Sequence, residues 1–258
     1  MNKPLTLTAL QSDLIWEDKT KNLAAFEKAL TTLLPTDLVI LPEMFTTGFT
    51  MAAQKFAESM DGTTVQWMQH WSKKLDAAVA GSTIISDNGT TYNRFLFVSP
   101  EGSVQFYDKR HTFTLAGEHK AYTQGQNDGL IAYKGWKICL RVCYDLRFPV
   151  WGRNTSDYDL LLYTANWPHK RINAWDNLLK ARAIENMSYC VGVNRIGTDG
   201  SNLKYPGHTA VYDFMGKTIG QTTPNKAGHC QVILTKEDQE LARKKLNFLN
   251  DRDHFTIQ

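Results

Sequence analysis

The chain has 258 residues, of which 42% are apolar and 21% charged, a balance that indicates a folded protein with a substantial core. Its net charge of +3 is small and its Lys and Arg residues are scattered, which argues against a nucleic-acid groove and an anionic membrane surface. No apolar segment approaches the ~20 residues that span a bilayer, and no secretory signal is evident, so we expect a cytoplasmic protein. The cysteines are then expected to be free thiols: Cys139, Cys143, Cys190 and Cys230.

Short apolar runs alternate with amphipathic segments along the chain. Strands are predicted for the runs at 5–10, 37–42, 78–85, 94–100, 137–143, 159–165 and 189–195. Helices are predicted for the amphipathic segments at 18–34, 64–77, 171–187 and 235–246. Within 78–107 and 205–234 the strands follow one another through short turns, which indicates antiparallel neighbours. The pattern therefore favours an α/β fold over a pure βα barrel.

The domain organisation is expected to be simple, because the sequence has no repeat and no linker rich in Pro, Gly or Ser. We expect a single domain over residues 1–258. Its core is expected to cover about 4–235, followed by a C-terminal helix and tail at 236–258.

Three polar side chains follow predicted strands directly. Glu43 comes after "LVILP", Lys109 after "SVQFYD" and Cys143 after "ICLRV". Each one alone is more typical of a loop carboxylate, a surface cation and a small buried side chain. Together they supply a base, a positive charge and a thiol, and a thiol with an ordinary pKa of ~8.5 needs such neighbours to become a good nucleophile. Strand ends in α/β sheets gather reactive groups, so we expect the three to converge.

The contexts "LPEMF", "YDKRH" and "CYDLRFP" resemble those of the Glu-Lys-Cys triad in the nitrilase superfamily of carbon-nitrogen hydrolases. The resemblance covers nearly the whole chain. It extends to "AGEHKAYTQG", which supplies Glu118 as a second glutamate, and to "YTANWP", "LLKARAIEN" and "VGVNRIG". Within the superfamily the chain is most similar to the bacterial ω-amidases.

This resemblance implies a four-layer αββα sandwich with two mixed sheets, and a homodimer. It also implies hydrolysis of the terminal amide of short 2-oxo dicarboxylic acid monoamides, such as 2-oxoglutaramate and 2-oxosuccinamate, through a cysteine thioester. Cys143 would attack, Glu43 would act as general base, and Lys109 would stabilise the oxyanion with the backbone N–H of Tyr144. Glu118 would also belong to the site, where holding the ammonium of Lys109 is favoured over the alternative role of proton transfer, and no cofactor is required.

The walls of the substrate pocket are expected from the neighbours of these positions, with ordinary core packing as the alternative for each. Aromatic side chains there would exclude water and shape a short substrate: Phe45, Tyr107, Tyr144 and Trp167. Two cations, Arg147 and Arg171, are candidates to bind the far carboxylate of the substrate, and the sequence does not choose between them. Arg147 has the alternative role of supporting Asp145 inside the fold, and His111 is close enough to Lys109 to touch the pocket rim.

Other functions are disfavoured. The seven histidines show no HExxH or paired Cys/His spacing, so no metal site is expected, and the glycines do not form a dinucleotide-binding GxGxxG. Three alternatives stay open: another hydrolase of the superfamily (an aliphatic amidase, a carbamoyl-amide hydrolase or a nitrilase), a catalytically silent scaffold, and a weakly supported redox pair of Cys139 and Cys143. The pair is weak because four residues along a strand separate the thiols too far for a disulfide.

Overall fold

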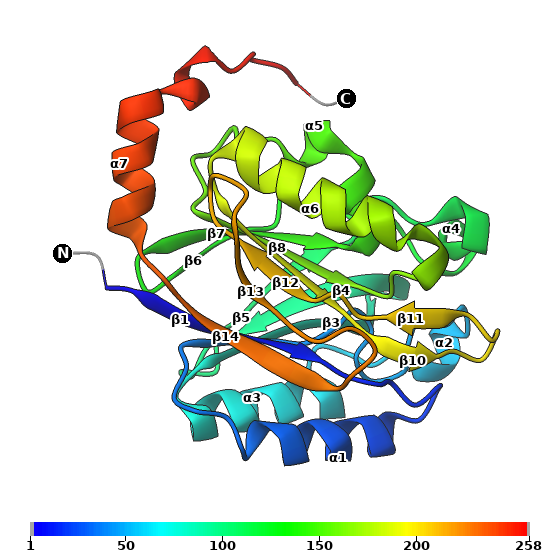
Figure 1. Ribbon diagram of the computed structural model, residues 1–258. Helices are drawn as coiled ribbons and strands as arrows, with labels where there is room; N and C mark the ends of the chain where they lie inside the picture. Colours follow the sequence, from blue (N-terminus) through cyan, green and yellow to red (C-terminus); the bar gives the residue numbers. More distant parts are fainter. Residues whose placement is uncertain (1–2, 257–258) are drawn as a thin grey trace.

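The computed structural model describes residues 3–256 and contains two six-stranded β-sheets that face each other (Figure 1). The first sheet has the order β14-β1-β2-β3-β4-β5. Its strands are β1 (Leu5–Gln11), β2 (Leu38–Ile40), β3 (Ala78–Asp87), β4 (Thr90–Val98), β5 (Val104–Asp108) and β14 (Gly228–Leu234). The second sheet has the order β13-β12-β9-β8-β7-β6. Its strands are β6 (Leu130–Tyr133), β7 (Trp136–Val142), β8 (Leu160–Ala165), β9 (Tyr189–Asn194), β12 (Ala210–Tyr212) and β13 (Thr218–Gln221). A separate hairpin is formed by β10 (Ile196–Thr198) and β11 (Lys204–Pro206).

Both sheets are mixed. In the first sheet β1, β2 and β3 pair in parallel, while β14, β4 and β5 join antiparallel. In the second sheet β7, β8 and β9 pair in parallel, while β6, β12 and β13 join antiparallel. Parallel neighbours need long crossovers, whereas antiparallel neighbours need only turns. The short turns within 78–107 and 205–234 had indicated antiparallel neighbours there. The prediction of an α/β fold with two mixed sheets is confirmed.

Helices cover the outer face of each sheet. The α-helices are α1 (Lys19–Leu30), α2 (Ala53–Phe56), α3 (Thr63–Leu75), α4 (Glu118–Ala121), α5 (Pro149–Gly152), α6 (Ile172–Asn186) and α7 (Lys236–Leu246). Short 3₁₀ turns are η1 (Thr114–Ala116), η2 (Cys143–Arg147), η3 (His169–Arg171) and η4 (Phe248–Asp251). Figure 1 shows α1 and α3 on the first sheet, and α5 and α6 on the second, so the layers follow the order αββα. Within residues 3–256, no helix is both long enough and apolar enough to cross a membrane.

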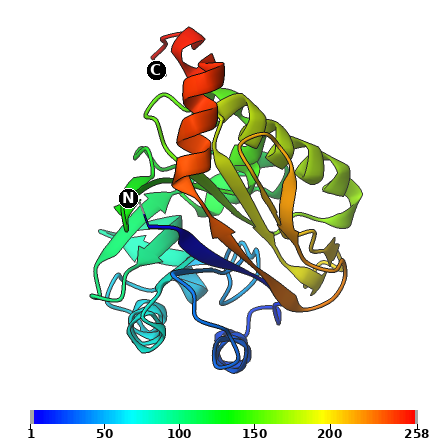
Figure 2. The same ribbon diagram turned by 60° about the vertical axis from the view of Figure 1, so that its left-hand side comes forward.

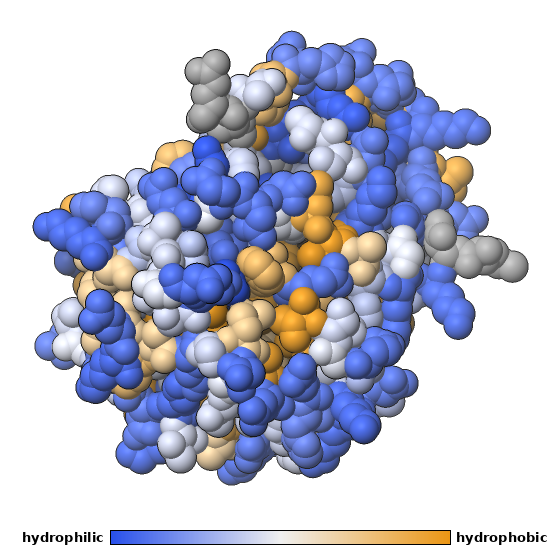
Figure 3. All heavy atoms as spheres, turned by 180° about the vertical axis from the view of Figure 1, so that it is seen from behind, coloured by the Kyte–Doolittle hydropathy of each residue, from blue (hydrophilic) through white to orange (hydrophobic). Residues whose placement is uncertain are grey.

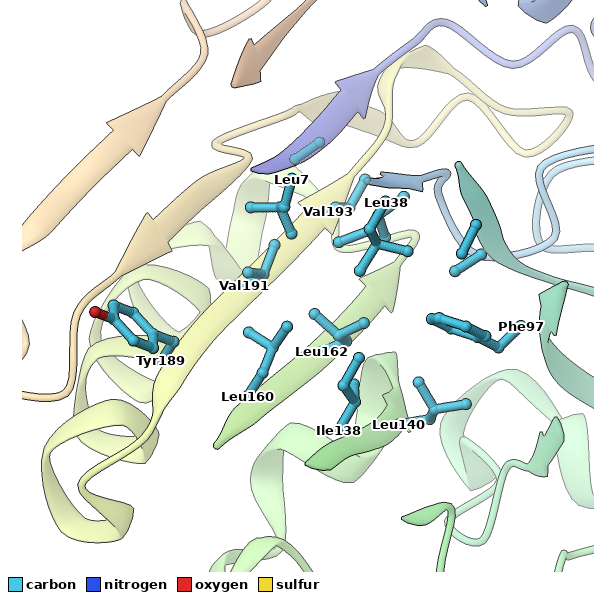
Figure 4. Packing of buried hydrophobic residues seen from close by; sticks show 14 of the residues in the cluster. Leu7, Leu38, Phe97, Ile138, Leu140, Leu160, Leu162, Tyr189, Val191 and Val193 are labelled. Carbon is cyan, nitrogen blue, oxygen red and sulfur yellow. The ribbon is translucent and has the colours of Figure 1, made fainter. Parts of the chain in front are cut away.

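The main core lies between the two sheets. Leu7, Leu38 and Phe97 project from the first sheet and meet Leu160 and Val191 from the second (Figure 4). All five side chains are fully buried. Helices cover the outer faces as well, so most strands are apolar on both sides, which explains why they read in the sequence as continuous apolar runs.

The helix α7 lies outside the sandwich, beside one end of it (Figure 2). Its Arg243 donates hydrogen bonds to the carbonyl oxygens of Tyr158 at 2.6 Å and Met187 at 2.9 Å, and also contacts the carboxylate of Asp159. These contacts attach the helix to the second sheet at the end where β8 and β9 begin. The loops that follow β2, β5, β7 and β8 meet elsewhere, around the candidate site.

Candidate active site

The loops after β2, β5 and β7 bring Glu43, Lys109 and Cys143 together. Lys109 Nζ lies 3.0 Å from Glu43 Oε1, and Lys109 and Cys143 line the same cavity. Glu43 is fully buried and Lys109 is almost so, whereas Cys143 is partly exposed. A base, a cation and a thiol that are far apart in the sequence therefore share one site.

A second carboxylate completes the surroundings of the lysine. Lys109 Nζ donates to both oxygens of the buried Glu118, at 3.0 and 2.9 Å. The backbone N–H of Phe113 donates to Oε2 of Glu118 and fixes that carboxylate in turn. The ammonium of Lys109 is thus held between two acidic side chains, Glu43 and Glu118.

Two asparagines that the sequence analysis did not single out hold the base. Asn93 Nδ2 donates to Glu43 Oε1 at 2.9 Å and to Glu118 Oε1 at 3.2 Å. The backbone N–H of Asn166 donates to Glu43 Oε2 at 2.8 Å, and its Nδ2 donates to the carbonyl oxygen of Glu43 at 2.7 Å. Asn93 lies in β4, "TTYNRFLFV", which begins four residues before the strand predicted at 94–100, so the prediction left Asn93 outside the strand.

The charges of the site control its protonation. Burial raises the pKa of the Cys143 thiol well above its usual range, the carboxylate of Glu43 adds to the rise, and the ammonium of Lys109 opposes it. Burial disfavours the ammonium of Lys109, but the carboxylates of Glu118 and Glu43 outweigh that effect and raise the pKa of Lys109. Burial also raises the pKa of Glu118, against the opposing effect of Lys109. These effects favour the thiol form of Cys143 and the ammonium form of Lys109.

Cys143 begins a sharp turn at the end of β7. Its backbone has φ +44°, in the left-handed region, which costs a residue with a side chain about 1–2 kcal/mol. The Sγ atom lies 4.0 Å from the carbonyl oxygen of Asn166, in the loop after β8. This turn moves the thiol out of the strand and places Cys143 among the residues that line the cavity.

The cavity has a volume of about 440 Å³, which suits a small organic substrate. Much of its lining is apolar or aromatic: Trp16, Phe49, Met51, Phe113, Tyr144, Trp167 and Leu203. Arg147 and Arg171 line it as well, together with the acidic residues Glu17 and Asp199. Both acids are already engaged: Glu17 accepts from Thr50, and Asp199 accepts from the hydroxyl of Tyr205.

The expected aromatic walls divide into two groups. Tyr144 and Trp167 line the cavity. Phe45 does not, because its ring is fully buried and packs against Phe26 and Trp67 beneath the helices of the first sheet. Tyr107 does not either. Its buried side chain points into the interior, where its hydroxyl donates to Asp145 at 2.8 Å.

The two candidate arginines both lie on the cavity. Arg147 stacks on the ring of Trp167, and Arg171 stacks on that of Phe113, with guanidinium-to-ring distances of 5.0 and 5.1 Å. Among residues 3–256 neither guanidinium forms an ion pair, whether with Asp145 or with another carboxylate. His111 does not line the cavity; its ring contacts Asp145 in the interior. Two positive charges are therefore available to an anionic ligand.

A thiol, a carboxylate and a fixed ammonium are the groups that nucleophilic catalysis by a cysteine uses. No cluster of three or more His, Cys, Asp or Glu side chains able to hold a metal ion is present in the described part of the chain. All four cysteines are free thiols.

Known proteins share both the sequence and the architecture. The chain is 42% identical to the "Omega-amidase YafV" of Yersinia enterocolitica over 253 residues, which cover 98% of each chain. It is 32% identical to the "2-oxoglutaramate amidase" of Bacillus subtilis over 222 residues, 84% of this chain and 85% of that one. The structure superposes with a TM-score of 0.96 on a CN-hydrolase superfamily protein from Xanthomonas campestris, which carries an arsenic adduct in its active site. That protein is 38% identical, and the match covers 99% of this chain and all of that one.

The profile of the carbon-nitrogen hydrolase family matches residues 6–244, nearly the full length. The chain belongs to the carbon-nitrogen hydrolase family and is a hydrolase of carbon–nitrogen bonds other than peptide bonds.

Proposed function

We propose that this protein is an ω-amidase that hydrolyses the terminal amide of 2-oxoglutaramate and 2-oxosuccinamate to the 2-oxo dicarboxylic acid and ammonia. The observation that carries the chemistry is the ammonium of Lys109, held 3.0 Å from Glu43 on the cavity that Cys143 also lines. The similarity to ω-amidases over 98% of the chain supports the choice of substrate.

In the proposed reaction the sulfur of Cys143 attacks the amide carbon while its proton passes to Glu43. The resulting oxyanion is stabilised by the ammonium of Lys109 and the backbone N–H of Tyr144. The carbon–nitrogen bond then breaks, Glu43 returns the proton to nitrogen, and ammonia leaves a thioester. Water attacks the thioester with Glu43 again as base, the carbon–sulfur bond breaks, and the proton returns to the thiol.

Glu118 has a positioning role in this scheme. Its two oxygens hold Lys109 at 3.0 and 2.9 Å and orient the ammonium before the oxyanion forms. Asn93 donates to both carboxylates and fixes their mutual orientation. The cation is thereby preorganised, and such preorganisation is the main source of electrostatic stabilisation in water-excluded sites.

The far carboxylate of the substrate is assigned to Arg147 and Arg171. A guanidinium suits a carboxylate because its N–H groups match the two oxygens, and stacking on Trp167 and Phe113 orients both side chains. Removing a hydrogen bond to a charged group costs about 1.5–3 kcal/mol, roughly a 10- to 150-fold change. Arg147→Ala and Arg171→Ala are expected to raise KM for 2-oxoglutaramate by a factor in this range and to leave KM for a neutral amide unchanged.

The test of function is ammonia release from 2-oxoglutaramate, compared with release from an aliphatic amide, an N-carbamoyl compound and a nitrile. The proposal requires the highest kcat/KM for 2-oxoglutaramate. A preference for one of the other compounds would assign the chain to a different activity of the same superfamily. Absence of turnover and of any thioester on Cys143 would favour a catalytically silent scaffold.

We also propose a cytoplasmic homodimer, as the resemblance to the family implies. Large apolar side chains are exposed, among them Val150 and Phe255, which line one hollow of the surface. Figure 3 shows apolar side chains gathered near the centre of one face. Contiguous apolar areas of this kind mark protein–protein contacts. Sedimentation equilibrium of the purified chain tests the dimer, and a monomer at all concentrations would refute it.

A further inference from the structure

Asp145 is a fully buried carboxylate two residues after Cys143 that does not line the cavity. Its Oδ2 accepts hydrogen bonds from the backbone N–H of Val142 at 2.9 Å and from the hydroxyl of Tyr107 at 2.8 Å. Its Oδ1 accepts from the backbone N–H of His111 at 3.1 Å and lies 2.7 Å from Nδ1 of the same residue. The two oxygens therefore have four partners.

These four contacts join segments from different sheets. Val142 is the last residue of β7 in the second sheet and immediately precedes Cys143. Tyr107 and His111 lie two residues to either side of Lys109, where the chain leaves β5 of the first sheet. One carboxylate thus connects the turn that presents the nucleophile with both flanks of the lysine.

Aromatic packing fixes the partners of Asp145. The hydroxyl of Tyr107 accepts a hydrogen bond from Trp151 Nε1 at 2.8 Å. The ring of His111 stacks on Phe148, with centroids 3.7 Å apart and planes 5° from parallel. Contacts with Trp151 and Phe148 therefore fix the side chains of Tyr107 and His111 independently of Asp145. The two side chains are held in positions from which both can bind the carboxylate of Asp145.

The chemistry of the contacts requires a carboxylate. Three of the four partners of Asp145 are fixed donors, namely two backbone N–H groups and a tyrosine hydroxyl. An ionised carboxylate accepts from all of them, whereas an amide of the same shape presents its NH₂ to at least one donor. The hydrogen bond to Val142 N–H also supports the turn in which Cys143 adopts φ +44°.

We propose that Asp145 is a positioning residue for the amide hydrolysis described above, on which this inference rests. It sets the separation between the sulfur of Cys143 and the ammonium of Lys109, so that the oxyanion formed by attack lies within reach of the ammonium. Misplacement of reacting groups by about 1 Å can cost on the order of 100-fold in rate. The role is distinct from catalysis itself, because Asp145 does not reach the cavity.

Asp145→Asn tests this role. The expected result is a fall in kcat of roughly 10- to 100-fold with KM changed less than about threefold, because the groups proposed to bind substrate are untouched. Alkylation of Cys143 by iodoacetamide should slow by about tenfold, and this readout does not depend on which amide is the natural substrate. If the wild-type protein released no ammonia, the proposed function would fail, but the alkylation ratio would still decide the role of Asp145.

Asp159→Asn is the matched control. Asp159 is equally short and also buried, and it accepts from the backbone N–H of Lys137 at 2.9 Å and from Arg243, away from the cavity. The Asp159→Asn variant should unfold at a lower urea concentration than the wild-type protein and keep the wild-type kcat. The proposal would be overturned if both variants lost stability but Asp145→Asn kept the wild-type kcat and the wild-type rate of alkylation.

A second variant covers the case in which Asp145→Asn gives no folded protein. The double substitution Tyr107→Phe with His111→Ala removes two of the four contacts and leaves the carboxylate in place. We expect kcat to fall by about tenfold with little change in KM. A kcat within twofold of wild type in this double variant would refute the positioning role.

Discussion

Replacing Glu43 with glutamine removes the proposed base while preserving its shape. In the wild-type site Oε1 accepts from Lys109 at 3.0 Å and from Asn93 at 2.9 Å, and Oε2 accepts from the backbone of Asn166 at 2.8 Å. Both oxygens therefore face donors. Whichever way the new amide turns, its NH₂ group meets an N–H or an ammonium, so Glu43→Gln loses hydrogen bonds as well as the base.

The expected size of the effect follows from these two losses. Removing a positioned base typically costs 10²–10⁴-fold in rate, about 3–5 kcal/mol of barrier. Burial, which raises the pKa of the Cys143 thiol, disfavours ionisation of the thiol without a base. We therefore expect kcat/KM for 2-oxoglutaramate to fall at least about 100-fold in Glu43→Gln, measured by ammonia release.

Glu43→Gln should also change the pKa of Cys143: although the variant loses activity, its thiol should ionise more readily. Burial is the main cause of the raised pKa of Cys143, and the negative charge of Glu43 is the next. Glu43→Gln removes that charge, so the pKa of Cys143 must fall and the thiolate must form at lower pH than in wild type. The ultraviolet absorbance of the thiolate across a pH series measures this, with Cys143→Ala subtracted as background.

Glu58→Gln is the control, since Glu58 is also a carboxylate paired with a lysine, Lys19, but is only partly buried and lies away from the cavity. It should retain wild-type turnover. Turnover of Glu43→Gln within tenfold of wild type, or a Cys143 titration that moves to higher pH, would refute the reasoning.

Three further predictions concern the cation, the core and the buried thiol of β7, Cys139. Lys109→Met should lower kcat by about 10²–10³-fold, the cost of losing one oxyanion donor, and this can be measured by ammonia release. Phe45→Ala should lower the free energy of unfolding by about 3–5 kcal/mol in urea titrations, with KM changed less than threefold, because the ring packs in the core. Cys139 is fully buried and does not line the cavity, so Cys139→Ala should keep wild-type activity. Burial also raises the pKa of Cys139 to about 11, so mass spectrometry after mild oxidation should find no disulfide between Cys139 and Cys143.

Much of the fold was predictable because its strands are covered on both sides. The seven predicted strands correspond to β1, β2, β3, β4, β7, β8 and β9. Short elements were not predicted: β6, β10 and β13 have three or four residues each, too few to show a periodic pattern. The pairing of β14 with β1 joins opposite ends of the chain, and local sequence carries no signal for such a contact.

The site was predictable only in part, for a related reason. The end of a strand indicates where a side chain leaves the sheet, which brought out Glu43, Lys109 and Cys143. A residue close in sequence to a site residue can still point its side chain away from the site. Phe45 is two residues from Glu43, yet its ring packs with Phe26 in the core. Asn166 came from a loop that matched the family, but its contact with Glu43 spans 123 residues and became visible only in the structure.

The charge of Lys109 limits which groups can move protons in the proposed reaction. The carboxylates of Glu118 and Glu43 outweigh burial and raise the pKa of Lys109, which favours the ammonium form in the resting site. A group that does not release its proton cannot serve as the acid for departing ammonia. The thiol of Cys143 gives up its proton in the first step, and Glu118 remains bound to the ammonium and to the N–H of Phe113. We therefore assign the proton that ammonia carries away to Glu43, which in the proposed reaction is both the base of the attack and the acid of the departure.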